Sequence, residues 1–184
     1  AGAVAGARPG GQGPAAARNA GAQRARGSGL VFLDSDDVLL PGAIDLFADA
    51  HQMGHQLVRT CATVQRQGQI TEVPAVRSGF PFPRGSPLAG SFSVGRELFH
   101  SIHGFDHAFR YGENSELLFR AQREVQSRGE SVFFADISTV FCSDRPDRSS
   151  THYATARLAA VELMLEKHGE ALRADKRTTA DHHA

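Results

Sequence analysis

The sequence predicts an α/β fold, and three observations lead to this prediction. Segments that favour helix and segments that favour strand alternate along the chain. Residues 30–33 form a short, wholly apolar run, which is typical of a buried strand. Carboxylates follow this run directly, and the carboxyl end of a buried strand is where α/β proteins bind ligands.

The helices are predicted from apolar periodicity and from the residues that begin and end them. An alanine-rich stretch follows Pro14, and Gly27 and Gly29 close that first helix. Pro41 opens the second helix. The remaining helices are expected at 96–102, 113–128 and 155–172. The last of them carries an apolar side formed by Leu158, Val161, Leu165, Ala159 and Leu163.

The other strands are expected where apolar and polar residues alternate. Residues 57–73 predict a hairpin with a turn near Gly68. Shorter strands are expected at 90–93, 132–134 and 137–141. A loop rich in proline and glycine separates the hairpin from the strand at 90–93.

Length and composition indicate one globular domain. The chain has 184 residues, of which 41% are hydrophobic and 22% charged. We expect a loose or irregular segment at 1–12, the domain at 13–172 and a loose tail at 173–184.

The charge balance and the cysteine count exclude several classes of protein. The formal net charge of zero argues against a nucleic-acid-binding surface. No apolar run reaches the roughly 18 residues that a membrane helix needs. Two cysteines are too few for a disulfide scaffold, and we expect them to be buried and reduced in a cytoplasmic protein.

Three aspartates, Asp34, Asp36 and Asp37, end the apolar run at 30–33. Their mutual repulsion is costly unless a cation neutralises them, and oxygen ligands of this kind suit Mg²⁺ or Mn²⁺. A structural role is equally compatible with the pattern, with Asp36 or Asp37 capping the helix that Pro41 opens.

Two enzyme classes have a strand end of this type. The segment 32–39 resembles the first motif of haloacid-dehalogenase-like phosphatases, which would make Asp34 the nucleophile and Asp36 the acid/base. That family needs a later lysine and a second acidic pair. This chain has only Lys167 and Lys176, both near its C-terminal end, so this interpretation ranks second.

Two segments resemble family 2 glycosyltransferases of the GT-A type. The first comprises Gly13-Pro14, Arg18-Asn19, Ala25-Arg26-Gly27, Phe32-Leu33-Asp34-Ser35-Asp36-Asp37 and Pro41. The second comprises Gly104-Phe105-Asp106, Phe109, Gly112-Glu113-Asn114-Ser115-Glu116-Leu117 and Arg120. The resemblance implies a three-layer α/β/α fold with a mixed sheet. It also implies metal-assisted transfer of a sugar, with inversion, from a nucleotide sugar to an acceptor hydroxyl.

The resemblance also implies roles for individual residues. Asp36 and Asp37 would contact the ribose and the metal, and Asp34 would be the first acid of the donor motif. Arg18 and Asn19 match the Arg-Asn pair of the helix beside the donor site, and an anchor between helix and sheet is an equally good interpretation of both. Arg148 would lie in a loop that closes over the donor phosphates.

The expected general base is replaced in this chain. The second segment usually carries a Glu-Asp pair whose aspartate takes the acceptor proton, and Asn114 stands in that position. Glu113 and Glu116 are the candidate replacements, with Glu113 preferred because it begins the helix. A non-catalytic member of the family is the third interpretation.

The resemblance begins at the third unit of the family pattern, so the nucleotide-binding strands at its start are expected to be missing from this chain. The acceptor would be a carbohydrate, lipid-linked or other hydroxyl, which leaves peripheral membrane contact open.

His51 and His55 have a spacing compatible with zinc, but we expect them and His100, His103 and His107 to be structural or exposed.

Overall fold

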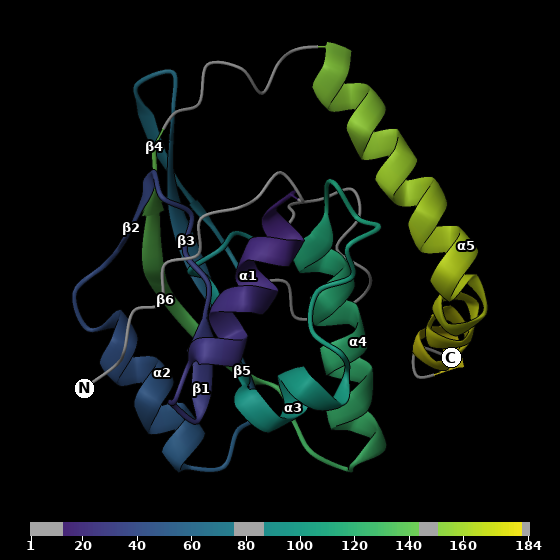
Figure 1. Cartoon of the computed structure of the whole chain (residues 1–184), viewed down its shortest axis with the longest axis horizontal. Helices are drawn as coiled ribbons and strands as arrows, with labels where there is room; N and C mark the ends of the chain where they lie inside the picture. Colours follow the sequence, from purple (N-terminus) through teal and green to yellow (C-terminus); the bar gives the residue numbers. More distant parts are fainter. Residues whose placement is uncertain (1–12, 76–86, 144–150, 182–184) are drawn as a thin grey trace.

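The computed structural model describes residues 13–75, 87–143 and 151–181. Figure 1 shows the arrangement of the helices and strands within these ranges. In chain order they are α1 (Gly13–Arg24), β1 (Gly29–Val31), β2 (Asp37–Leu39), α2 (Ala43–Gln52), β3 (Leu57–Arg66), β4 (Gln69–Val73), β5 (Phe92–Gly95), α3 (Arg96–Ser101), α4 (Glu113–Ser127), β6 (Phe133–Cys142) and α5 (Thr151–Asp181).

The strands form one mixed six-stranded sheet in the order β1-β5-β3-β6-β2, with β4 paired to β3. Strands β3 and β6 are parallel, and every other pair is antiparallel. The β3–β4 turn has Gln67 at φ 50° and Gly68 at φ 78°. Two consecutive residues in the left-handed region are typical of a tight hairpin turn. The hairpin predicted at 57–73 is therefore confirmed.

Helices cover both faces of the sheet, as a three-layer α/β/α fold requires (Figure 1). Helices α1, α3 and α4 pack on one face in a core that includes Ala22, Phe99 and Leu117. Helix α2 covers the other face, where Phe47 packs with Val58 of β3. The predicted fold class is confirmed.

Helix α5 lies on the outer side of α4 (Figure 1). Met164 of α5 packs there against Phe109 and Phe119. The prediction of its apolar side is wrong in part, because Leu158 and Leu165 are 61% and 58% exposed. The helix also continues to Asp181, so the predicted helix end at 172 is wrong.

The sheet differs from the sequence prediction at two further places. Strand β6 (Phe133–Cys142) is continuous where two strands were expected at 132–134 and 137–141, because the β3–β6 register shifts around Cys61 and accommodates the extra residues. The second difference is β2, a three-residue strand that begins at Asp37 and was not predicted. The expected segment 1–12 lies outside the described residues.

Candidate functional site

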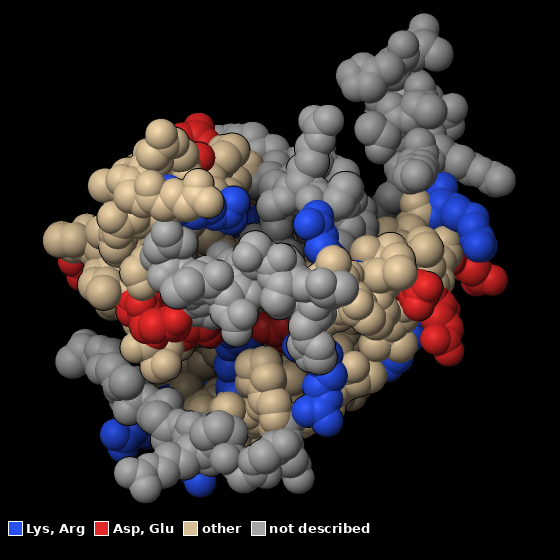
Figure 2. Space-filling model, turned by 90° about the horizontal axis from the view of Figure 1, so that it is seen from above, with Lys and Arg blue, Asp and Glu red and all other residues tan. Residues whose placement is uncertain are grey.

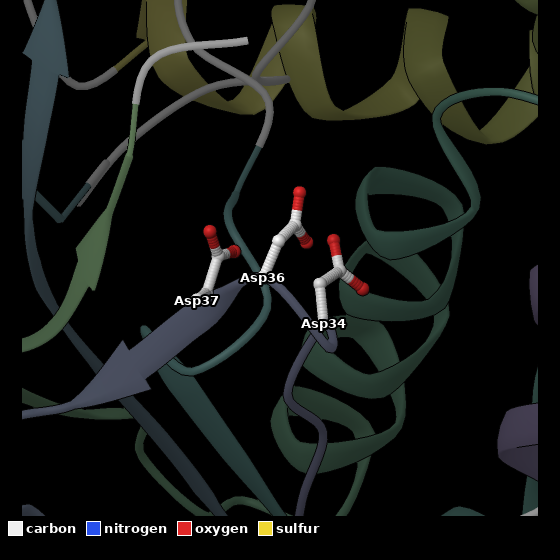
Figure 3. Close-up of side chains that lie close together, drawn as sticks. All are labelled: Asp34, Asp36 and Asp37. Carbon is white, nitrogen blue, oxygen red and sulfur yellow. The ribbon is translucent and has the colours of Figure 1, made fainter.

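The three aspartates lie in a tight turn between β1 and β2. The backbone N–H of Asp37 donates to the carbonyl of Asp34 at 3.1 Å, which folds residues 34–37 back on themselves. Carboxylate oxygens of Asp34, Asp36 and Asp37 consequently lie within 4.8 Å of one another. Figure 3 shows the three side chains projecting from the same turn.

The donor set of this turn fits a hard divalent cation. All three ligand groups are carboxylates, and Mg²⁺ and Mn²⁺ prefer oxygen ligands of this kind. Asp37 is buried, whereas the side chain of Asp34 is 32% exposed, so the cluster extends from the sheet edge to the surface. The alternative cap for the next helix is wrong, because α2 begins after Gly42 without a side-chain cap.

Arg18 of α1 connects this turn to the N-terminus of α4. Its Nη2 donates to Oδ1 of Asp34 at 2.6 Å, and its Nη1 donates to Oε1 of Glu113 at 2.5 Å. The side chains of Arg18 and Glu113 are only 11% and 12% exposed. Two motifs that are far apart in the sequence are therefore joined by one guanidinium.

The electrostatic environment keeps Arg18 charged. Burial alone would lower the pKa of Arg18, but the Glu113 and Asp34 carboxylates outweigh burial and raise that pKa above its ordinary value. The guanidinium carbon also lies 5.4 Å from the centroid of the Phe105 ring. Arg18 is thus a fixed positive charge between two acidic segments.

Asn19, the neighbour of Arg18, is bound to the loop at Phe105. Its side chain accepts from the backbone N–H of Phe105 at 2.9 Å and donates to the carbonyl of the same residue at 2.8 Å. Gly104 has φ 66°, and a Cβ built there would lie 2.6 Å from Oδ1 of Asn19. An anchor between helix and sheet was one of the two predicted roles of Asn19; the observed bonds join α1 instead to the loop at Phe105.

Asn114 also contacts Arg18. Its Oδ1 accepts from Nη1 of Arg18 at 3.1 Å, and its Nδ2 donates to the carbonyl of Pro87 at 3.0 Å. The residue that replaces the expected aspartate is therefore bound within the same cluster.

Glu116 is not brought to the acidic turn. It is 1% exposed, and its carboxylate accepts from Nε of Arg120 at 2.5 Å and from Nη2 at 2.6 Å. His168 of α5 lies 3.0 Å from the same carboxylate, and Arg120 also donates to the carbonyls of Ile102 and Gly104. Through these contacts, Glu116 and Arg120 join α4 to α5 and to the turn at 102–104.

Both ring nitrogens of His51 lie close to other groups of the protein. Nδ1 of His51 lies 2.7 Å from the carbonyl of His55 and Nε2 lies 2.5 Å from Oγ of Ser93, so the pair shows no shared metal geometry. Both cysteines are buried, as predicted. Arg148 lies outside the described residues.

The sequence interpretation missed two contacts of α5, those of His168 with Glu116 and of Lys167 with Asp106. The second pair is separated by 2.5 Å. Only the spacing of Glu116 and Arg120, four residues apart on one helix, signalled part of this arrangement.

Acidic and basic side chains lie next to one another on the face seen in Figure 2. Carboxylates at this edge of an α/β sheet lie where proteins of this fold class bind their ligands.

The chain belongs to family 2 of the glycosyltransferases: the model of that family, "Glycosyl transferase family 2", matches residues 7–112, more than half of the 184 residues. The match includes α1 and the acidic turn and ends one residue before α4. A comparison with curated proteins found no matching relative. Among the described helices, none is long and apolar enough to cross a membrane.

Proposed function

We propose that this protein transfers a sugar, with inversion at C1, from a nucleoside-diphosphate sugar to the hydroxyl of an acceptor. The observation that carries the proposal is Arg18, which binds Asp34 on the donor side and Glu113 on the acceptor side. The family membership supports glycosyl transfer in general. The donor, the metal and the stereochemistry are our proposals.

The acidic turn would bind the donor. Asp36 and Asp37 would hold Mn²⁺ or Mg²⁺, and Asp34 and Asp36 would face the nucleotide. The cation, when bound, neutralises the charge that develops on the diphosphate leaving group. Arg18 keeps Asp34 in place and provides a second positive charge at the same edge of the sheet.

Glu113 would act as the general base. Its carboxylate would take the proton of the acceptor hydroxyl while the hydroxyl oxygen forms a bond to C1 of the sugar. The bond between C1 and the diphosphate oxygen breaks, and the nucleoside diphosphate leaves with that electron pair. A single displacement of this kind inverts the configuration at C1.

A non-catalytic nucleotide-sugar-binding protein is the second candidate. Asn114 favours it, because an amide cannot accept the acceptor proton and Glu113 is already paired with Arg18. A phosphohydrolase is not favoured, because the Asp34 carboxylate is bound by Arg18, and the amine of Lys167 by Asp106.

The test measures release of nucleoside diphosphate from a panel of UDP- and GDP-sugars, with Mn²⁺, with EDTA, and with simple glycoside acceptors. The proposal expects turnover that depends on the metal and falls at least about 100-fold in Asp37→Asn. Asp49→Asn on the exposed face of α2 is the matched control. Donor binding without turnover would favour the second candidate, and no metal-dependent binding would overturn both.

A further inference from the structure

Asn114 at the start of α4 forms hydrogen bonds in two directions, and their chemistry is complementary to an amide. Its Oδ1 faces the Arg18 cation at 3.1 Å, and its Nδ2 faces the Pro87 carbonyl at 3.0 Å. The acceptor atom of the side chain therefore meets a donor, and the donor atom meets an acceptor. Only a side chain that carries both a donor atom and an acceptor atom can form hydrogen bonds with both Arg18 and the Pro87 carbonyl.

An aspartate in this position would not reproduce these contacts. An ionised carboxylate only accepts hydrogen bonds, so one of its oxygens would face the Pro87 carbonyl without a proton between them. It would also be a third carboxylate on Arg18, which already binds Asp34 and Glu113. The replacement of the family's acid by an amide thus fits the surroundings of this position.

The Pro87 bond holds the beginning of a well-anchored segment. After Pro87, the N–H of Ser91 donates to the carbonyl of Leu88 at 3.1 Å, and Oγ1 of Thr139 donates to the carbonyl of Gly90 at 2.6 Å. This segment leads into β5, the strand that pairs with β1 immediately before the acidic turn. Asn114 consequently connects α4 with the sheet next to the candidate donor site.

The Arg18 bond holds the other side of the cluster. The same Nη1 that donates to Asn114 also donates to Glu113 at 2.5 Å, so both residues share one donor group. Any displacement of Asn114 therefore changes how the hydrogen bonds of Nη1 are shared between Glu113 and Asn114.

We infer that Asn114 is a positioning residue, which requires an amide and fixes Arg18 and Glu113 relative to the segment that enters β5. This inference rests on the proposed function, because Glu113 is the group that it positions for the acceptor. The amide of Asn114 thus has a function of its own in this site, beyond replacing the general base of the family.

The kinetic test compares wild type with Asn114→Asp. We expect kcat to fall at least about tenfold while KM for the donor changes less than about twofold, because the donor contacts belong to the acidic turn. The acidic limb of the pH–kcat profile should move to higher pH, because a further carboxylate shares Arg18. Gln126→Glu, which adds the same charge at the exposed far end of α4, should change neither parameter. A rise in kcat in Asn114→Asp would overturn the inference.

Hydrogen exchange without substrate tests the anchoring independently of the reaction. In Asn114→Asp and in Asn114→Ala, the amides of residues 88–95 should exchange about tenfold faster than in wild type, while those of residues 57–66 stay unchanged. Unchanged exchange at 88–95 in both variants would overturn the inference even if the donor is turned over. Faster exchange in a protein that turns over no donor would support the anchoring role and contradict only the proposed function.

Discussion

Two clusters at α4 each contain an arginine–glutamate pair, and the surroundings of the two pairs differ. Arg18 meets Glu113 and Asp34, whose side chain is 32% exposed, so this cluster reaches the surface. Arg120 meets Glu116, which is 1% exposed and also contacts His168. An arginine–glutamate pair is therefore a candidate site in one case and an anchor in the other. The additional partner distinguishes the two, because Arg18 also meets the partly exposed Asp34, whereas Glu116 also meets His168.

The buried cluster should give the largest change in stability. In Glu116→Gln, Arg120 loses the carboxylate that it binds through two nitrogens, and we expect the free energy of unfolding to fall by about 3 kcal/mol. Urea denaturation measures this change. The matched control is Glu124→Gln on the same helix, because Glu124 pairs with Arg128 at 2.8 Å but is 39% exposed. The free energy of unfolding of that variant should fall by less than about 1 kcal/mol. Equal losses in the two variants would contradict the anchoring role of Glu116.

Asn19→Ala should give the next largest change, and it tests whether two neighbours on α1 have separate roles. Both backbone groups of Phe105 lose their partner, which should lower the free energy of unfolding by about 2 kcal/mol. Asn19→Asp keeps the acceptor for the Phe105 N–H and should lie between wild type and Asn19→Ala. Similar stability of all three proteins in urea would show that the two bonds between Asn19 and Phe105 do not stabilise the fold.

Arg18→Lys should affect stability less and turnover more. A lysine keeps the charge but cannot bind Asp34 and Glu113 with a rigid planar fork, so we expect a loss of about 1 kcal/mol of stability. Turnover of the donor should fall at least about tenfold. A variant with wild-type turnover would show that the link between the two acidic segments has no role in the reaction.

His51 should produce the smallest effect, and a pH-dependent one. Burial lowers the pKa of His51 below its ordinary value, although the hydrogen bond to the His55 carbonyl opposes this. The folded state therefore prefers the neutral ring. This contribution to stability is complete above about pH 6.5 and is lost as the pH falls below that value.

Because His51 is only partly buried, the loss should stay below about 1 kcal/mol between about pH 7.5 and pH 5.5. Urea titrations of wild type and His51→Gln at both pH values measure it. The variant should show a smaller pH dependence than wild type, and an equal dependence would exclude His51 as its source.

Part of this structure could be predicted from the sequence because the signals are local. The helix from Glu113 to Ser127 and the hairpin at 57–73 follow from apolar periodicity and from glycines that end each element. The acidic turn follows from three aspartates after an apolar run, and the structure brings their carboxylates together.

The remainder depends on contacts between distant segments. Strand β2 has three residues and begins with Asp37, so its pairing with β6 leaves no periodic signal. Glu113 and Glu116 are three residues apart on one helix, and only the positions of Arg18 and α5 separate their roles. The buried side of α5 was equally hidden, because leucines lie on both its exposed and its partly buried sides.

The most direct test of the account is Mn²⁺ binding in the presence of UDP, followed by the electron paramagnetic resonance of free Mn²⁺. We predict that wild type and Asp49→Asn bind one Mn²⁺ per chain, and that Asp36→Asn and Asp37→Asn weaken this binding at least about tenfold. Equal binding by all four proteins would contradict the claim that the turn at 34–37 is the metal-assisted donor site.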